Sequence, residues 1–242
     1  MGDRQTPVIN VENASKYFNI NVQEPSKGKM DGFESVRKIK RPAVKQASLA
    51  LYSGEWVGLL GENGSGKSTL LKMVGGYYGP DEGTIEVGGA VLPFFGPDEE
   101  LHPEGQVQDA IMVKALQVGL PRSEALKIYE KIISFSRLHE FRSQKIKQLS
   151  TGMKTRLMLG LMLNINADVY LFDEIPATTD IKFQQKVEQR LNRLKEMNKS
   201  ALVVSHNIDE LRELCPNSIL MHNGEIVAYD NTDTVLRMYA ES

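Results

Sequence analysis

The stretch Gly61-Glu62-Asn63-Gly64-Ser65-Gly66-Lys67-Ser68 decides the fold of this chain. It follows a short apolar run, Trp56 to Leu60, and opens a helical pattern that begins at Lys67. The stretch fits the phosphate-binding motif G-x-x-x-x-G-K-[ST], which lies between a strand and a helix. A glycine-rich turn that arose by chance would not be expected to have both neighbours. Glycines let backbone N–H groups turn towards an anion, and the start of the helix adds positive potential. We therefore expect a bound nucleotide here, with the candidate ligands Asn63, Gly64, Ser65, Gly66, Lys67, Ser68 and Thr69.

A second apolar run supplies acidic residues that complement the phosphate loop. Val169 to Phe172 predicts a buried strand, and Asp173 and Glu174 follow it directly. Ligands of open α/β sheets bind at the carboxyl ends of the strands, although such a pair would on its own also fit a solvated strand end. We expect Lys67 to reach the outer phosphates and Ser68 and Asp173 to hold Mg²⁺. Glu174 is expected to act as the general base on the attacking water.

The pattern around these two motifs alternates strand and helix at both ends of the chain, with helical patterns in the middle. This order predicts an α/β protein with a mostly parallel sheet and an inserted helical lobe. The polar stretch 20–42 contains Pro25, Gly28 and Gly32 and predicts an inserted loop or hairpin. Strands are expected at 8–11, 48–52, 56–60, 84–87, 169–172 and 201–205, and helices at 67–74, 107–118, 123–135, 151–163, 181–197 and 234–239.

The composition narrows the classes of protein that remain. With 242 residues, 41% hydrophobic and 25% charged, the chain fits one soluble globular domain with a sizeable core. The net charge of −2 gives no reason to expect nucleic acid as a partner. The single cysteine, Cys215, excludes a disulfide within the chain and indicates a reducing compartment. No apolar run reaches the ~18 residues of a bilayer span, so a role at a membrane would need another chain to cross it.

A local basic run stands out from this balanced composition. It consists of Arg37, Lys38, Lys40, Arg41 and Lys45. Such a run fits a solvated surface loop, and it also fits a patch that faces anionic lipid headgroups or a charged substrate. The sequence leaves both interpretations open.

A further motif carries a resemblance to a known family. Leu149-Ser150-Thr151-Gly152-Met153 resembles the L-S-G-G-Q signature of ABC ATPases, with departures at Thr151 and Met153. The serine-x-glycine-methionine form looks like that of the nucleotide-binding subunits of bacterial exporters of O-antigen, capsule and teichoic acid. The resemblance covers nearly the whole chain, from about Val8 to Tyr239, apart from 20–42.

The resemblance implies a fold and its division along the chain. The expected fold is a P-loop NTPase core with a mostly parallel sheet, an antiparallel β subdomain and an inserted α-helical subdomain. The chain would form a single nucleotide-binding domain, 1–242. Residues 1–97 and 165–242 would be the RecA-like core with its β subdomain, and 98–164 the helical subdomain with the signature.

Other elements of the family fall in order along the sequence. Tyr17 stands where the family places an aromatic ring on adenine, although ordinary packing would also explain it. Asp180 ends the stretch from Ala177 that matches the D-loop, which contacts the opposite subunit. His206 follows a predicted strand and matches the switch histidine that contacts the γ-phosphate. A structural role is the alternative for this lone histidine.

One family element is missing. The family's usual glutamine after the strand near Phe94 is absent, which leaves the γ-phosphate sensor unassigned between Asp98 and Glu99. The polysaccharide exporters also tend to lack this glutamine and to carry a downstream His-Pro-Glu, here His102-Pro103-Glu104. The departure therefore supports the resemblance to that subfamily.

The resemblance also implies partners and a place in the cell. Two copies of the chain would pack head to tail around two ATP molecules, so that Ser150, Thr151 and Gly152 complete the site of the other copy. Two copies of an integral membrane permease would receive the resulting movement at the cytoplasmic face of the cell membrane. Phe94, Phe95 and Leu101 are candidates for the docking surface, with core packing as the alternative for the two phenylalanines.

Several functions remain in competition. The first is ATP-driven export of a cell-surface polysaccharide, and its near alternative is transport of another substrate. A soluble ABC ATPase acting on ribosomes or DNA is disfavoured, because the chain has one phosphate loop and too short a stretch between Ser68 and Ser150 for a long coiled coil. A small-molecule kinase built on the same loop would not need Leu149 to Met153 or His206.

Overall fold

The phosphate loop leaves a six-stranded sheet whose strand order is β5-β6-β7-β3-β8-β9. The computed structural model describes residues 6–24, 35–96, 101–177 and 180–241. Neighbouring strands are parallel from β5 to β8, and only β9 runs antiparallel to its neighbour β8. Both faces of the central strands are covered, and the sequences of these strands are therefore continuous apolar runs. The strands are β3 (Trp56–Leu60), β5 (Val91–Phe94), β6 (Val169–Asp173), β7 (Ser200–Val204), β8 (Asn217–His222) and β9 (Glu225–Asn231).

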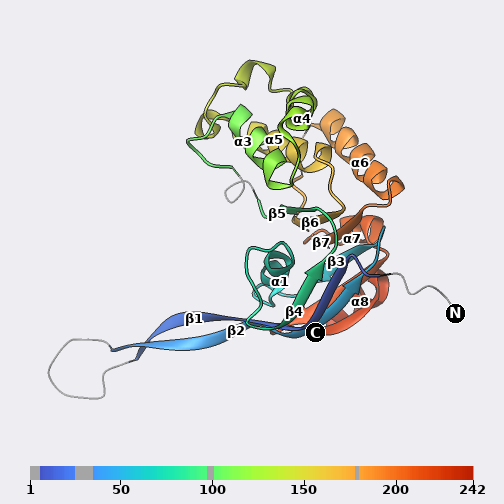
Figure 1. Ribbon diagram of the computed structural model, residues 1–242. Coiled ribbons are helices and arrows are strands. Elements are labelled where there is room, and N and C mark those ends of the chain that lie inside the picture. The colour runs from blue at the N-terminus through green and yellow to red at the C-terminus, as the bar shows by residue number, and fades with distance from the viewer. Residues whose placement is uncertain (1–5, 25–34, 97–100, 178–179, 242) are drawn as a thin grey trace.

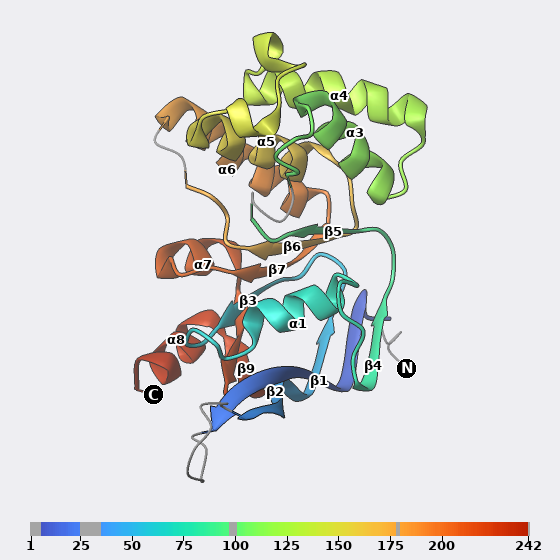
Figure 2. The same cartoon turned by 90° about the vertical axis from the view of Figure 1, so that its left-hand side faces the viewer.

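A second, antiparallel sheet has the order β2-β1-β4. Its strands are β1 (Ile9–Glu24), β2 (Ser35–Leu51) and β4 (Glu82–Val87). Helix α1 (Lys67–Val74) lies between the two sheets and packs its apolar side chains into the core that they share (Figure 2). The helix that follows the phosphate loop is therefore held on both sides.

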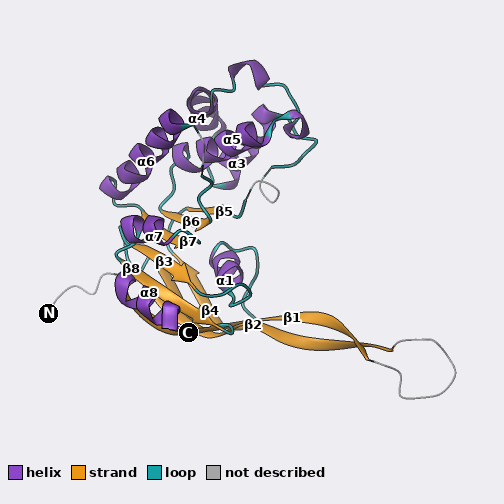
Figure 3. Ribbon diagram, turned by 180° about the vertical axis from the view of Figure 1, so that it is seen from behind, coloured by secondary structure: helices purple, strands orange, loops and turns teal. Residues whose placement is uncertain are grey.

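Strands β1 and β2 form a long hairpin that projects from the body of the protein (Figures 1 and 3). Their pairing runs from Ile9 opposite Leu51 to Glu24 opposite Ser35, so the hairpin alternative for 20–42 is confirmed and the loop alternative is wrong. Register shifts near Ala14 and Lys16 interrupt the alternation of apolar and polar residues. That interruption, together with the polar outer half, hid most of both strands from the sequence pattern.

Helices α3 to α6 gather above the β5–β6 edge of the large sheet, whereas α7 and α8 lie beside its other strands (Figure 1). The middle helices agree with the expected ranges to within a residue or two, whereas α7, β8 and β9 were not predicted. One apolar cluster continues from this face of the sheet into the helices. Among the residues that the structure describes, no helix is long and apolar enough to cross a membrane. The helices are α3 (Val107–Gln117), α4 (Arg122–Ser136), α5 (Thr151–Asn164), α6 (Ile181–Glu196), α7 (Ile208–Leu214) and α8 (Thr232–Glu241), with 3-10 turns at His139–Phe141 and Ile146–Gln148.

Gly160 lets α4 and α5 pack closely, and this contact gives a test of the helical lobe. A Cβ at Gly160 would lie 2.1 Å from Oγ of Ser136, a buried side chain that donates a hydrogen bond to the Arg156 carbonyl. We expect Gly160→Ala to lower the free energy of unfolding by about 1–3 kcal/mol through overpacking. Gly152, in the same helix, has no atom within 4 Å of the corresponding position. Gly152→Ala should therefore stabilise the protein by up to about 1 kcal/mol through helix propensity.

Urea unfolding of the two variants, followed by circular dichroism, measures this difference. Equal effects of the two substitutions would contradict the close α4–α5 contact.

Candidate active site

The loop between β3 and α1 has the backbone that the phosphate motif requires. Gly61, Gly64 and Gly66 all have positive φ, at 141°, 83° and 106°. A Cβ would lie 2.2 Å from the Met221 carbonyl oxygen at Gly61 and 2.4 Å from the Ala43 carbonyl oxygen at Gly66. Side chains are therefore excluded at these two glycines, and the loop stays close to β8 and β2.

Lys67 begins α1 and turns back over the loop. Its Nζ donates to the carbonyl oxygens of Gly61, at 2.7 Å, and Glu62, at 2.8 Å. Burial lowers the pKa of the Lys67 ammonium, and the charges of Asp173 and Glu174 act in the opposite direction. The cation and the two carboxylates therefore share one electrostatic environment, as expected for a site that handles a phosphate anion.

Glu174 and His206 meet at the carboxyl ends of β6 and β7. Oε1 of Glu174 lies 3.2 Å from Nε2 of His206, and each side chain is 60% exposed. The backbone of Glu174 is in the left-handed region, with φ of 68°, and its N–H donates to the Val204 carbonyl oxygen at 2.9 Å. This conformation is strained for a residue other than glycine and turns the carboxylate out of the sheet towards the phosphate loop.

Part-buried hydrogen bonds hold the turn that carries His206. The hydroxyl of Ser205 donates to Oε2 of Glu210 at 2.5 Å and accepts from the backbone N–H of Asn207 at 3.0 Å. The Asn207 side chain accepts from the N–H groups of Asp209 and Glu210 and so caps α7. Burial raises the pKa of the Glu210 carboxyl. Glu210 therefore positions the turn from behind, although the sequence pattern did not indicate it.

We expect Glu210→Ala to remove the acceptor for the buried Ser205 hydroxyl. The unpaired group should lower the free energy of unfolding by about 1–3 kcal/mol, and the loosened turn should lower kcat for nucleotide hydrolysis several-fold with little change in KM. Glu210→Gln keeps an acceptor oxygen and should restore most of both quantities. Steady-state kinetics with thermal melts would check this, and a glutamine variant as impaired as the alanine variant would exclude the positioning role.

The predicted phosphate-site residues line one cavity of roughly 870 Å³. Ser65 is not in that lining, and its buried hydroxyl has no hydrogen-bond partner in the part of the chain that the structure describes. A phosphate oxygen would supply the missing acceptor, so this orphaned group fits a bound nucleotide. The predicted residues in the lining are Asn63, Gly64, Gly66, Lys67, Ser68, Thr69, Asp173, Glu174 and His206.

The cavity has a second wall that the sequence did not indicate. The hairpin β1–β2 supplies Phe18, Ile20, Arg41, Pro42, Ala43 and Lys45, and other segments add Phe95, Gly96, Val204 and Asn223. The basic run thus lies on strand β2 and not in a loop, although Lys38, Lys40 and Arg41 are exposed to solvent as the surface interpretation expected. Arg41 and Lys45 face the cavity, whereas Lys40 lies 4.2 Å from the centre of the Tyr17 ring. The side chain of Arg37 is outside the described residues.

Tyr17 is not among the residues that line this cavity. Its ring is covered by Lys40, its hydroxyl donates to Glu82 at 3.3 Å, and its backbone N–H donates to Asp81 at 2.8 Å. The next residue, Phe18, lines the cavity instead and meets the ring of Tyr78 edge to face. The structure therefore favours the packing alternative for Tyr17, because the register shifts before it decide which of two adjacent aromatic residues faces the cavity.

The signature residues lie outside this cavity. Ser150 caps α5, its Oγ accepting from the Met153 N–H at 3.3 Å, and Thr151 and Gly152 form the first turn of that helix. Asp180 caps α6 and pairs with Arg137 at 3.1 Å. The Phe183 N–H and the Arg137 charge hold the pKa of Asp180 below its usual range. Contacts of these residues with a second copy stay a prediction.

The predictions for the γ-phosphate sensor and for the docking surface have different outcomes. Asp98 and Glu99, the candidate γ-phosphate sensors, lie outside the described residues. Phe94, Phe95 and Leu101 are buried in the two apolar cores, so the prediction that they form an exposed docking surface is wrong and core packing explains them.

The donor set fits Mg²⁺ held together with a nucleotide. The described residues contain no group of three or more acidic, histidine or cysteine side chains that would bind a metal alone. Mg²⁺ commonly takes one or two protein oxygens, and nucleotide phosphates and water complete its octahedron. The Ser68 hydroxyl and the Asp173 carboxylate, both on the cavity wall, would supply those protein oxygens.

Comparisons with known proteins agree with this site. Residues 44–177 match the family model described as ABC transporter. The O-antigen export system ATP-binding protein RfbB of Klebsiella pneumoniae is 31% identical over 210 residues, which cover 87% of this chain and 85% of that protein. The teichoic acids export ATP-binding protein TagH of Staphylococcus haemolyticus (strain JCSC1435) is 31% identical over 233 residues, or 96% of this chain and 88% of that protein.

Solved structures share the fold. A dimeric post-hydrolysis structure of the ATP-binding cassette MJ0796, bound to ADP and Pi, superimposes with a TM-score of 0.72. The two sequences are 22% identical, and the match covers 93% of this chain and 98% of that chain. This similarity confirms the predicted fold class.

Proposed function

Because this chain belongs to the ABC transporter family, we propose that it hydrolyses ATP to drive export of a cell-surface polysaccharide. The observation that carries the proposal is the meeting of Lys67, Asp173, Glu174 and His206 in one cavity beside the phosphate loop. The names of the relatives, which include O-antigen and teichoic acid export, support the class of cargo.

The geometry divides the chemical work among a few side chains. Lys67 would exchange its two carbonyl acceptors for the outer phosphates, and the loop N–H groups would bind the remaining phosphate oxygens. Glu174 would take the proton of the attacking water, and His206, 3.2 Å away, would orient that carboxylate and donate to the γ-phosphate. Mg²⁺, held by Ser68 and Asp173, would neutralise charge on the phosphates. Phe18 is the aromatic residue placed to stack on the base.

A second copy would complete the site. Ser150 and Gly152 lie outside their own cavity, and the Ser150 hydroxyl and the Gly152 N–H would bind the γ-phosphate held by the partner's Lys67. Two such contacts related by a two-fold axis give a closed dimer with two nucleotides between the copies. We assign 98–164 as the lobe that carries these residues and 1–97 with 165–242 as the core.

The surface for a membrane partner would lie between α1, β5 and α3. A groove of roughly 340 Å³ runs there past Gly75, Tyr77 and Pro93. Tyr77, in the lining of this groove, exposes 49% of its surface, and Val113 and Leu116, on α3 but outside the lining, expose 54% and 51%. Apolar side chains in such a concentration would suit an amphipathic helix of a permease at the cytoplasmic face of the membrane.

Charge on the exposed apolar side chains of α3 beside this groove tests the proposal. We expect Val113→Glu/Leu116→Glu to abolish co-purification with the permease from the membranes of the source cell, because two buried carboxylates would face an apolar helix. Hydrolysis by the isolated subunit should stay within about two-fold of wild type, since surface substitutions away from the cavity have small effects. Leu126→Glu, on the exposed face of α4, is the matched control and should co-purify normally.

Cells depleted of the protein should accumulate the polysaccharide inside and lose it from the surface. Normal surface polysaccharide after depletion would reject the cargo, and recovery of ribosomes or DNA in place of a permease would reject transport.

A further inference from the structure

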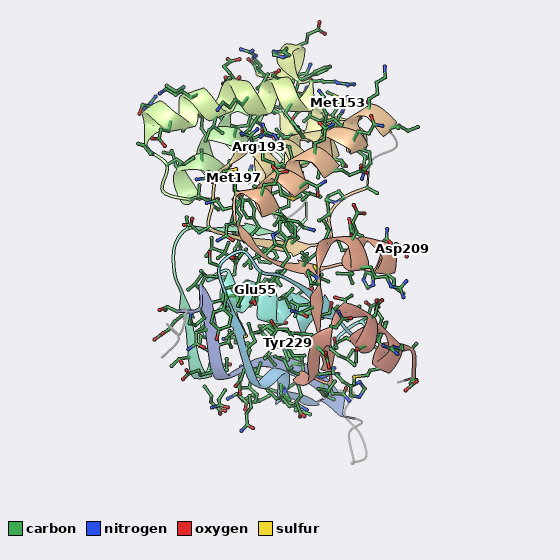
Figure 4. All side chains as sticks on the ribbon, turned by 90° about the vertical axis from the view of Figure 1, so that its right-hand side faces the viewer. Glu55, Met153, Arg193, Met197, Asp209 and Tyr229 are labelled. Carbon is green, nitrogen blue, oxygen red and sulfur yellow. The ribbon has the colours of Figure 1, made fainter. Side chains whose placement is uncertain are left out.

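A second groove, of roughly 650 Å³, lies between α4 and α6. It shares no lining residue with the nucleotide cavity. Figure 4 shows Arg193 on α6 at this groove, with α4 above it. Figures 1 and 3 place α6 and α3 on opposite sides of α5, so the groove faces away from the surface proposed for the permease.

The groove is strongly basic although the whole chain has a net charge of −2. Lys131 on α4 and Lys186, Arg190 and Arg193 on α6 line it. The three α6 residues are spaced by four and three positions, which puts them on one face of the helix. The only acidic side chain in the lining, Glu130, is held by both terminal nitrogens of Arg142, at 3.0 and 2.9 Å.

The charges of these cations are unbalanced. Arg190 donates to the Asn164 amide oxygen at 2.9 Å. The side chains of Lys131, Lys186 and Arg193 make no hydrogen bond or ion pair with any residue in the described ranges. Like charges four residues apart on a helix repel each other and lower its stability. An anionic occupant would reverse that repulsion.

Two other lysines of the lobe, Lys145 and Lys147, have an acidic partner. Lys145 and Lys147 both pair with Glu104, at 3.0 and 2.7 Å. Lys145 and Lys147 therefore provide a paired, charge-matched comparison for the unpaired cations of the α4–α6 groove.

The form of the groove identifies its occupant. Lys131, Lys186 and Arg193 are exposed, so water and salt would screen the attraction of any one of them for a small anion, and several negative charges must bind together. A membrane surface would touch only the rim of a hollow between two helices. An extended peptide can lie inside it and place apolar atoms on the half-buried ring of Phe135.

We propose that the α4–α6 groove binds an acidic segment of a partner protein, with its carboxylates on Lys186, Arg190 and Arg193. Helix α4 belongs to the lobe with the signature, and α6 follows the strand with the catalytic carboxylates. A segment bound to both would restrain the lobe against the core. This regulatory docking does not depend on which substrate is exported.

The test uses a fluorescein-labelled octaglutamate peptide and the full chain, with ADP at saturating concentration to fill the nucleotide cavity. Fluorescence anisotropy is measured at about 50 mM salt, where screening is weak. Lys186→Glu/Arg193→Glu should bind the peptide roughly 10-fold or more weakly than wild type. Lys145→Glu/Lys147→Glu changes the net charge by the same amount and should bind within about two-fold of wild type.

Equal losses in the two variants, or no loss in either, would overturn the proposal. Binding of phosphatidylglycerol vesicles that requires Lys186 and Arg193, without binding of the peptide, would replace it with a membrane contact. If the charge-reversed variant fails a thermal-melt check, Lys186→Gln/Arg193→Gln is measured in its place and should also lose affinity.

Discussion

Glu174→Gln should lower kcat for ATP hydrolysis by about 100- to 10,000-fold, the usual contribution of a general base. The amide keeps the shape of the side chain and a bond to His206, 3.2 Å away, but it cannot accept the proton of the attacking water. ATP affinity should change little, because the phosphates are held by the loop and Lys67. ATP that is bound but not hydrolysed would then keep two copies of the chain together, so an ATP-dependent dimer should accumulate.

Coupled-enzyme kinetics, equilibrium binding of ATP and light scattering measure the three quantities. Glu188→Gln, an exposed change of the same kind on α6, is the matched control and should leave all three unchanged. Hydrolysis by Glu174→Gln at the wild-type rate would remove Glu174 from the role of base.

Ser150→Arg should abolish hydrolysis to a similar extent for a different reason. The arginine side chain would fill the space that the γ-phosphate of the ATP bound by the other copy needs. Ser150 also caps α5, so part of any defect would reflect the loss of about 1 kcal/mol of cap stability. Ser150→Asp keeps a capping oxygen but repels the γ-phosphate, and it should be folded as stably as wild type and equally inactive.

Mixing two inactive variants distinguishes action between copies from action within one copy. In a heterodimer of Ser150→Arg and Glu174→Gln, one site combines an intact Glu174 with an intact Ser150, and the other site carries both defects. Random pairing should restore about one quarter of the wild-type activity. No recovery, or normal turnover by a strictly monomeric Ser150→Arg protein, would reject the shared site.

The phosphate loop and the acidic strand end were predictable from the sequence because local rules determine them. Glycines with positive φ and an apolar strand that ends in carboxylates have few other structural explanations. The family interpretation followed from the same stretch and the signature, and the comparisons confirmed it. Helix α4 was also placed well, since its apolar periodicity matches its burial. Helix α5 instead carries a continuous run from Leu157 to Leu163 that is buried on all sides.

Features that depend on pairing between distant segments were not predictable. Phe18 and Arg41 lie on the cavity wall because main-chain pairing and register shifts set the faces of the hairpin, and neither leaves a periodic pattern. Glu210 looks like any exposed helical glutamate until the fold buries it against Ser205. Phe94 and Phe95 were assigned to a docking surface although they are buried, because the sequence pattern of apolar residues is the same in a core and at an interface.

The left-handed backbone of Glu174 ties hydrolysis to a loss of stability. A glycine would adopt a φ of 68° without strain, which for other residues amounts to roughly 1–2 kcal/mol. Selection for thermal stability alone would therefore favour glycine at this position, and the resulting protein would be more stable but would not hydrolyse ATP. A laboratory search for stable variants therefore needs to keep residue 174 unchanged. At this position the unstrained backbone requires glycine, whereas catalysis requires glutamate.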